Sequence, residues 1–343
     1  MSPQQPLVSV VMPVYNGEEF LREAIESVLA QTYSNWDFTI VNNCSTDATL
    51  QIAGQYARKD SRIRIHDNQE FLPMMRNINS SFRKLSPQSK YCKMLLADDW
   101  IFPECLERMV AVAEANPAVA VVGAYGLDGL RVMWQGLPYP STVVKGPEIA
   151  RATLLGGPYV FGSATSTLFR AELVRGRDPF FDEAGPQGDY LTCLELMRTY
   201  DFGFVHQILT FTRRRKNSAT SLSLDLNTYI LERLTALLKY GPVFLTPQEC
   251  RQQEKVWRRD YYEFLARSAL RLRERAFWRH HRTRLAQLGH SLSWLALMKA
   301  LLVECLNGIV HPRLAFAAVW NWWCHAWQRT ARRNAKEKAP VYP

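Results

Sequence analysis

The sequence lacks the cysteine pairs that are typical of an exported protein, and its first residues do not predict a leader segment. Its seven cysteines are an odd number, form no CxxC pair and stand among apolar neighbours. This pattern is typical of reduced, mostly buried thiols and not of a disulfide framework or a zinc site. The first residues, MSPQQPLVSVV, have no basic stretch ahead of the apolar ones. They predict a strand instead of a signal peptide, and we expect a cytoplasmic protein.

Two glycine-rich phosphate-binding motifs are also missing. No GxGxxG follows the first predicted strand, and the chain contains no GxxxxGK[ST]. Their absence argues against a dinucleotide-dependent dehydrogenase and against a P-loop NTPase. A sugar-phosphate nucleotidyltransferase would need a glycine-rich loop bearing Arg or Lys after that strand, and Tyr15–Phe20 has none.

Net charge is scarce in the first 250 residues and is concentrated beyond them. The whole chain carries +10, and from Arg251 onward 18 Lys and Arg stand against 6 Asp and Glu. The basic character therefore belongs to the C-terminal part alone. A near-neutral body with a basic C-terminal part indicates an acidic surface as partner, either a membrane or a nucleic acid.

Apolar periodicity predicts alternating strands and helices in the first two thirds of the chain. We expect strands over Leu7–Val14, Trp36–Val41, Arg62–His66, Ala118–Gly123, Gly162–Arg170 and Phe204–Phe211, and one more that ends at Asp98-Asp99. Helices are expected between them, and everything from Leu224 onward is predicted to be helical. This alternation indicates a mostly parallel mixed sheet flanked by helices, with domains at 1–222 and 223–343.

The segment Lys90–Trp100, KYCKMLLADDW, is a short apolar run that ends in two adjacent acids. Ligands bind where buried parallel strands stop, so we expect Asp98 to meet the strand ends at Tyr15 and Asn42 on one edge of the sheet. Two carboxylates repel each other unless a cation neutralises them, and a divalent metal that carries a phosphate suits such a pair. The alternative is a solvated turn with an Asp cap before the helix at Pro103.

Several motifs occur together in a recognisable order. The run SVVMPVYNGEEFLREAIESVLAQTYSNWDFTIVNNCSTDAT is followed by RNIN and then by ADD. In this order they resemble family 2 glycosyltransferases of the bacterial polysaccharide-assembly type, over about residues 7–215. The resemblance implies the A-type nucleotide-diphosphosugar transferase fold, which is Rossmann-like, and the helical C-terminal extension lies outside it.

The resemblance also implies a donor site for a nucleotide-sugar. Asp99, with Asp98 beside it, would bind Mg²⁺ or Mn²⁺, which offsets the charge that develops on the leaving diphosphate. Further donor-binding residues by this resemblance are Pro13, Tyr15, Glu18, Asn42, Asn43, Arg76, Asn77, Asp98 and Arg215. The family usually has an acid at the place of Asn42 or Asn43, so the identity of the nucleotide stays open.

Asp189, in GDYLTCLELM, matches the acid that opens a helix and serves as the catalytic base. Such a base accepts the proton of the acceptor hydroxyl as it attacks the anomeric carbon, and a single base gives inversion. The alternative for Asp189 is a helix cap after Gly188. For the whole protein, the alternative to transfer to a saccharide or lipid-linked acceptor is a non-catalytic nucleotide-sugar-binding or scaffold member of the same fold.

The C-terminal part, residues 251–343, combines arginines with tryptophans. Phe316–Trp327 alone holds four tryptophans and is followed by five more Lys and Arg. Trp-rich apolar stripes flanked by basic residues are typical of helices in the membrane interface, which predicts a peripheral contact with the inner face of the plasma membrane. The alternative is an ordinary helical subdomain with a solvated basic face. We expect no nucleic-acid partner, because no recognition module is visible.

Overall fold

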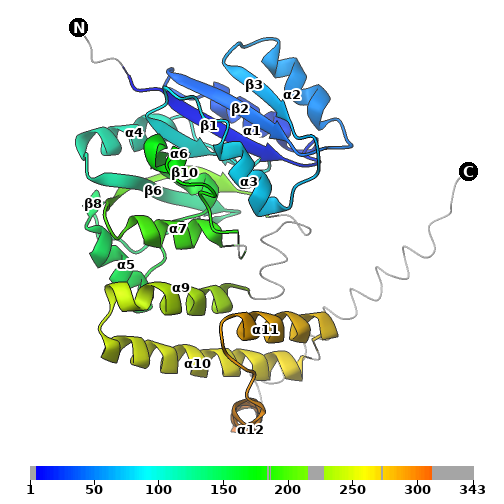
Figure 1. Ribbon diagram of the computed structural model, residues 1–343, viewed down its shortest axis with the longest axis vertical. Coiled ribbons are helices and arrows are strands. Elements are labelled where there is room, and N and C mark those ends of the chain that lie inside the picture. The colour runs from blue at the N-terminus through cyan, green and yellow to red at the C-terminus, as the bar shows by residue number, and fades with distance from the viewer. Residues whose placement is uncertain (1–4, 184, 186, 215–227, 272, 311–343) are drawn as a thin grey trace, which may run out of the picture. The chain divides into compact units, whose positions relative to one another are not determined.

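The computed structural model describes residues 5–183, 185, 187–214, 228–271 and 273–310 (Figure 1). The chain divides into two compact units after Gln253. The expected domain boundary after residue 222 lies outside the described residues. Each unit is described by itself below.

The first unit is built on a mixed sheet of ten strands in the order β3-β2-β1-β4-β9-β6-β10-β5, with β7 beside β6 and β8 beside β10. The strands are β1 Val8–Val14, β2 Trp36–Asn42, β3 Ile63–Asp67, β4 Tyr91–Met94, β5 Trp100–Ile101, β6 Val119–Asp128, β7 Arg131–Met133, β8 Val143–Val144, β9 Leu168–Arg170 and β10 Asp201–Thr212. β3, β2, β1 and β4 are mutually parallel, which confirms the βαβ expectation for this half. Beyond β4 the pairs β4–β9, β6–β9 and β10–β5 are antiparallel.

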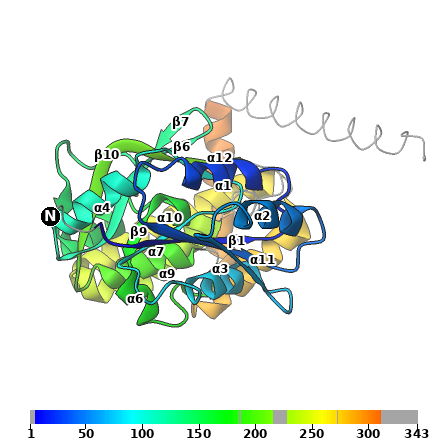
Figure 2. The same ribbon diagram turned by 90° about the horizontal axis from the view of Figure 1, so that it is seen from above.

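Helices cover both faces of this sheet because its strands are apolar on both sides. The helices of the first unit are α1 Leu21–Leu29, α2 Thr49–Ala57, α3 Met74–Phe82, α4 Cys105–Ala115, α5 Gly146–Leu154, α6 Ala171–Arg175, α7 Gly188–Leu196 and α9 Thr228–Phe244, and α10 Pro247–Leu270 begins in it. Val10 on β1 packs in the cluster that holds α1, α2 and α4, whereas its neighbour Val11 packs in the cluster of α3, α5, α6, α7 and α9. α1 and α3 accordingly lie on opposite sides of β1 (Figure 2).

Two strands, β4 and β9, are shorter than the ranges that the sequence pattern predicted. β4 ends at Met94, and Asp98 lies in a turn that follows it, so the acid pair is displayed by a loop and not by the strand itself. The expected strand over Gly162–Arg170 is reduced to β9, because Ala164–Ser166 forms a short 3-10 turn instead. That turn brings Thr165 to the acid pair.

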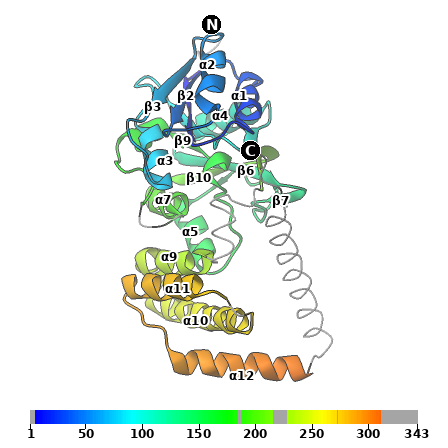
Figure 3. The ribbon, with the colours of Figure 1, turned by 90° about the vertical axis from the view of Figure 1, so that its right-hand side faces the viewer.

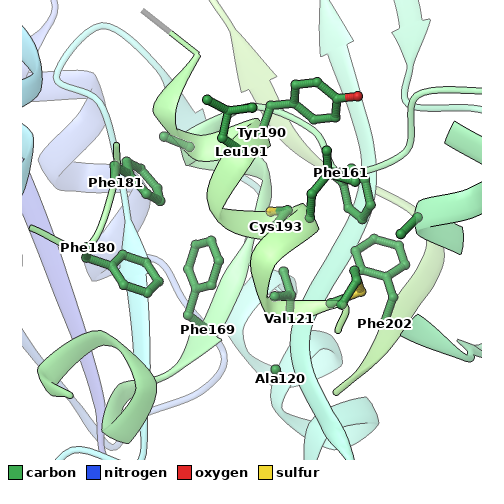
Figure 4. Packing of buried hydrophobic residues seen from close by; sticks show 14 of the residues in the cluster. Ala120, Val121, Phe161, Phe169, Phe180, Phe181, Tyr190, Leu191, Cys193 and Phe202 are labelled. Carbon is green, nitrogen blue, oxygen red and sulfur yellow. The ribbon is translucent and has the colours of Figure 1, made fainter. Parts of the chain in front are cut away.

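α7 is fixed by an aromatic cluster on the sheet. Phe161, Phe169, Phe181 and Phe202 surround its buried residues Leu191 and Cys193 (Figure 4). Burying large aromatic side chains contributes several kcal/mol in total, about 1.5–3 kcal/mol for each fully buried ring. The N-terminus of α7, where Asp189 lies, is therefore held by a well-packed framework.

α9 packs on α5 and α7. Its residues Ala236, Leu237 and Tyr240 are buried in the same cluster as α7, so this helix belongs to the first unit. The second unit contains the rest of α10, α11 Arg275–Gln287 and α12 Trp294–Val310. α12 runs across α10 and α11 and not alongside them (Figures 1 and 3). In the described part of the chain, no helix is both long and apolar enough to span a bilayer.

Candidate active site

The loops that follow β1 and β2 are tied together by hydrogen bonds. The Gly17 amide donates to Thr49 Oγ1 at 2.8 Å, and the Glu18 amide donates to Asp47 Oδ2 at 3.0 Å. The Glu18 carboxylate accepts from the Ala48 amide at 2.9 Å, where α2 begins. A carboxylate at a helix N-terminus is favoured by the exposed amides and the helix dipole there. Glu18, expected to bind the donor, thus fixes the loop after β1 against the start of α2.

Asn42 and Asn43 are both buried and both committed to protein partners. Asn43 accepts from the Leu72 amide at 2.9 Å and donates to the Leu72 carbonyl at 2.8 Å, which fixes the loop after β3. Asn42 donates to Asp67 Oδ1 at 2.7 Å. Asp67 itself is exposed at the end of β3. The acid that the sequence lacks at positions 42 and 43 is therefore present next to them, on the neighbouring strand.

Two exposed aromatic side chains stand at the same edge of the sheet. Tyr15 is 50% exposed and Phe71 is 57% exposed, and their ring centroids lie 4.9 Å apart in an edge arrangement. Apolar rings left this open to water, at the ends of two neighbouring loops, offer a surface on which a flat ring can stack. Pro13 is buried in β1, opposite Val41 on β2.

Arg76 and Asn77, both expected to bind the donor, lie in different environments. Asn77 is buried, and its side-chain Oδ1 accepts from Asn68 Nδ2 at 3.0 Å. Asn68 Nδ2 also donates to Asn43 Oδ1 at 3.1 Å. The Arg76 side chain is 67% exposed, and its Nε lies 3.5 Å from Glu183 Oε2, in the segment that leads to α7. Asn77 therefore fixes the loops, and Arg76 stands at the rim of the site.

The two acids after β4 have different environments. Asp99 is 2% exposed; its Oδ2 accepts from Thr165 Oγ1 at 2.7 Å, and its Oδ1 accepts from the Arg213 amide at 3.0 Å. Burial, together with the negative charge of Asp98, raises the pKa of Asp99 to about 7, against the effect of these hydrogen bonds. Asp98 is partly exposed. The accessible acid of the pair is thus Asp98, and Asp99 lies behind it.

The carboxylates of Asp98 and Asp99 fit a metal ion that is bound together with a phosphate-bearing substrate. In the described residues, no group of three or more His, Cys, Asp or Glu could hold a metal ion alone. Mg²⁺ at nucleotide sites is typically bound by one or two carboxylates together with substrate phosphates and water. Asp98 and Asp99 match that donor set. The raised pKa of Asp99 also fits, because a nearby cation would favour its charged form.

Arg213 closes the acid pair from the end of β10. Its Nε donates to the Asp98 carbonyl at 3.2 Å, and its guanidinium lies 4.1 Å from the centroid of the Phe20 ring. An arginine held by a hydrogen bond and an aromatic face has little freedom left. Arg215, the arginine expected to bind the donor, lies outside the described residues.

Asp189 is the second residue of α7 and is half-buried. Burial, with a further contribution from the charge of Glu232, raises its pKa to about 6. Its Oδ1 accepts from the amide of Tyr190 at 2.8 Å. The turn before it needs a glycine, because a Cβ on Gly188 would lie 2.2 Å from the Asp182 carbonyl oxygen. Gln187 is the N-cap of α7, so Asp189 lies in the first turn of the helix and not at the cap, with a pKa that approaches neutrality.

An aromatic cluster surrounds Tyr159. Burial, with a further contribution from the negative charge of Asp189, raises the pKa of Tyr159 well above its ordinary value. The Tyr159 ring lies 5.4 Å from that of Tyr190 and 5.7 Å from that of Trp134. Trp134 is partly exposed and has a φ of 65°, an uncommon conformation for a bulky residue. Such conformations persist where the surrounding structure enforces them, often at binding sites.

Residues 9–176 match the family model described as Glycosyl transferase family 2. Residues 9–176 therefore form a domain of this family. EpsE of Bacillus subtilis, described as a glycosyltransferase, is 34% identical over 158 residues, which are 44% of this chain and 56% of EpsE. The chain spans about half, or less, of the length of the curated relatives it matches.

Solved structures show the same fold. TarS 1-349 of S. aureus, in complex with UDP-GlcNAc, aligns with a TM-score of 0.60 and 17% identity over 82% of this chain and 80% of that one. The mannosyltransferase PcManGT of Pyrobaculum calidifontis, in complex with GDP-Man and Mn²⁺, aligns with a TM-score of 0.54 and 14% identity over 98% of this chain and 89% of that one. These likenesses confirm the expected A-type fold.

Within this family 2 domain, sequence reasoning found the strand ends but missed several residues that the fold adds to them. Thr165, Asp67, Phe71 and Trp134 come from a turn, a strand end and two loops that carry no motif of their own. One signal was available: Trp134 opens a short segment, WQGLPYP, that is too rich in Gly and Pro for a helix or strand.

Proposed function

We propose that this protein is an inverting, metal-dependent glycosyltransferase, which moves a sugar from a nucleotide-diphosphosugar to a hydroxyl of a saccharide or glycolipid acceptor. The observation that carries the proposal is the combination, in one compact unit, of an acid pair suited to a metal with a separate half-buried acid. Asp98 and Asp99 supply the first, and Asp189 supplies the second.

On the donor side, Asp98 and Asp99 would hold Mg²⁺ or Mn²⁺ together with the diphosphate. When bound, the metal offsets the negative charge that the leaving diphosphate acquires. Asp98 is the accessible ligand, and Thr165 and Arg213 hold Asp99 behind it through both carboxylate oxygens. Asp98 would thus contact the metal from the accessible side, and Asp99 would supply the second carboxylate from a fixed position behind it.

The nucleobase would stack on the exposed rings of Tyr15 and Phe71. Asp67 would accept a hydrogen bond from a ring N–H of that base, in place of the acid that Asn42 and Asn43 do not provide. A carboxylate is an acceptor only, so it pairs with the ring N–H of uracil or guanine and is repelled by the unprotonated ring nitrogen that adenine and cytosine have in that place. This favours a UDP-sugar or a GDP-sugar as donor.

On the acceptor side, Asp189 would take the proton of the attacking hydroxyl. A general base works best when its pKa lies near the working pH, and burial has moved the pKa of Asp189 to about 6. One base, with no nucleophilic carboxylate at the anomeric carbon, gives direct displacement and inversion. Trp134 and Tyr159 supply an aromatic wall against which the apolar face of a sugar ring packs, which supports a saccharide acceptor.

The acceptor class also bears on where the protein works. We assign it to polysaccharide or cell-envelope glycan synthesis in the cytoplasm, in peripheral contact with the inner face of the plasma membrane through residues 251–343. The basic character of that part of the chain supports the assignment.

A panel of nucleotide-sugars tests the donor proposal. A donor that binds the folded state raises the unfolding temperature by mass action, and we expect a UDP- or GDP-sugar to do so only with Mn²⁺ or Mg²⁺ present. Transfer to a sugar acceptor is then followed with that donor, and the anomeric configuration of the product is read by NMR. A retained configuration would refute the single-base mechanism.

The second candidate, a non-catalytic nucleotide-sugar-binding member, is favoured by the amides at Asn42 and Asn43. It predicts donor binding with neither transfer nor donor hydrolysis under any metal condition. Turnover by the purified protein that disappears in Asp189→Asn would exclude it.

A further inference from the structure

α11 and α12 enclose an open groove of about 620 Å³ in the second unit. Arg275, Arg279 and Arg282 line one side of it, and Trp294 and Met298 line the other. One wall is thus cationic and the other apolar. This groove, which we call the Arg–Trp groove, shares no residue with the candidate active site.

The cationic wall is a single face of α11. Spacings of four and three residues place Arg275, Arg279 and Arg282 side by side on a helix, and all three side chains are exposed. Among the described residues, none of these three guanidinium groups lies within 4 Å of a carboxylate, although other arginines of the unit are paired, for example Arg267 with Glu304. Three neighbouring like charges with no acid beside them call for an anionic partner.

The apolar wall belongs to α12, which exposes most of its large side chains. Leu295 is 84% exposed, Met298 61% and Leu302 63%, whereas Leu297 is 3% exposed and anchors the helix. α12 crosses α10 and α11, as Figure 3 shows, so its outer face is not covered by them. An apolar surface of this extent on one helix, with tryptophan at its start, is typical of helices that lie in a membrane interface.

We propose that the Arg–Trp groove docks on an anionic phospholipid surface, with the arginines at the phosphate level and the exposed face of α12 among the upper acyl chains. This inference names the surface and the lipid chemistry of the peripheral contact proposed above, and it does not depend on sugar transfer. α12 would lie along the membrane and not cross it, because Lys299 and Glu304 interrupt its apolar run.

Two other occupants fit the charges poorly. Residues 311–343 of this chain carry six Lys and Arg against one Glu, so they would add positive charge to the arginines. A second copy related by a two-fold axis would place the same arginines against one another, because such an interface pairs identical patches. An anionic membrane alone neutralises the cationic wall and covers the apolar one.

Co-sedimentation of the full chain with vesicles tests the proposal. We expect binding to phosphatidylcholine vesicles that contain phosphatidylglycerol, and much weaker binding to phosphatidylcholine alone. The triple variant Arg275→Glu, Arg279→Glu, Arg282→Glu should bind the anionic vesicles at least a hundredfold more weakly, because each lost basic residue removes roughly a fivefold factor and the three new carboxylates add repulsion. Leu295→Glu with Met298→Glu should also weaken binding, while leaving the charge of α11 intact.

The matched control reverses three arginines on α10, Arg251→Glu, Arg258→Glu and Arg259→Glu, which changes the net charge equally but leaves the groove intact. Equal loss of binding in this control would overturn the groove as the docking surface. So would a dimer in vesicle-free solution that Leu295→Glu with Met298→Glu converts to a monomer. Donor-dependent thermal shifts should be the same in all these variants, so failure of the membrane proposal remains distinct from failure of the proposed transferase function.

Discussion

Replacing Asp99 by asparagine should stabilise the metal-free protein and abolish its metal-dependent donor binding. The Asp99 carboxylate is buried beside Asp98, and both effects together raise its pKa to about 7. The replacement removes the buried charge but keeps the shape. The amide oxygen can still accept from the Arg213 amide, and the amide nitrogen can donate to Thr165 Oγ1, because a hydroxyl both donates and accepts.

The magnitude and sign follow from linkage between the pKa and folding. The pKa of Asp99 rises from 3.8 in the unfolded chain to about 7 in the folded protein. The folded state therefore binds this proton more tightly, so the contribution of Asp99 to the free energy of unfolding is highest below about pH 4 and falls as the pH rises toward 7. The difference between 3.8 and about 7 lowers the free energy of unfolding by about 4 kcal/mol above pH 7. Asp99→Asn should recover a large part of this at pH 8 and none at pH 4.

Urea unfolding of the metal-free wild type and of Asp99→Asn, at pH 4 and at pH 8, measures the effect. The difference between the two proteins isolates Asp99 from other groups that titrate in this range, such as Asp189. A thermal-shift assay with nucleotide-sugar and Mn²⁺ supplies the second readout, in which the variant should show no metal-dependent shift. An equal difference in stability at both pH values, or unchanged metal-dependent binding, would refute the reasoning.

The remaining predictions concern the other side chains of the site. Asp189→Asn should keep donor binding but lose transfer by roughly 10²–10⁴-fold, while Glu195→Gln on the same helix keeps both; in the wild type, kcat should rise through about pH 6 as Asp189 loses its proton. Asp67→Asn should weaken binding of the free nucleotide about tenfold, the loss of one charge-assisted hydrogen bond, as measured by calorimetry; an unchanged affinity would remove Asp67 from the base site. Trp134→Ala should raise KM for a saccharide acceptor and leave the donor Kd unchanged, and a change in the donor Kd alone would contradict the acceptor wall.

The parallel half of the fold was predictable because its signals are local. β1, β2 and β3 each lie within one residue of the range that apolar runs predicted, and hydrophobic alternation does not depend on distant partners. The antiparallel half was less predictable. β9 lies between β4 and β6, and its polar lead-in turns away from the sheet so that Thr165 can meet Asp99. That contact joins residues 66 positions apart, and no local pattern records it.

The site shows the same division. Sequence reasoning placed Asn42 and Asn43 at a strand end, which the parallel register with β1 and β3 confirms. Their partners could not be read from the chain, because an amide side chain bonds equally well to a ligand or to a loop. In the structure, Asn42 donates a hydrogen bond to Asp67 and Asn43 donates one to the Leu72 carbonyl. The acid that the family usually has at position 42 or 43, at the end of β2, is thus replaced by Asp67 at the end of the neighbouring strand β3. The donor-binding roles expected for the two amides remain a prediction.

The two described arginines after β10 form ion pairs with carboxylates of this chain, so their positive charge is not directed at a substrate. Arg213 binds Asp99 through its amide, and its guanidinium pairs with Glu23; Arg214 pairs with Asp128 at the end of β6. Both side chains are thus neutralised by carboxylates of this chain, and a diphosphate would have to displace those partners to be clamped by them. Arg213→Lys should therefore weaken the metal site through the looser fit of an ammonium group between Phe20 and Glu23, with loss of the metal-dependent thermal shift and little change in metal-free binding of the nucleoside. A loss of nucleoside binding as well would show that Arg213 contacts the donor directly.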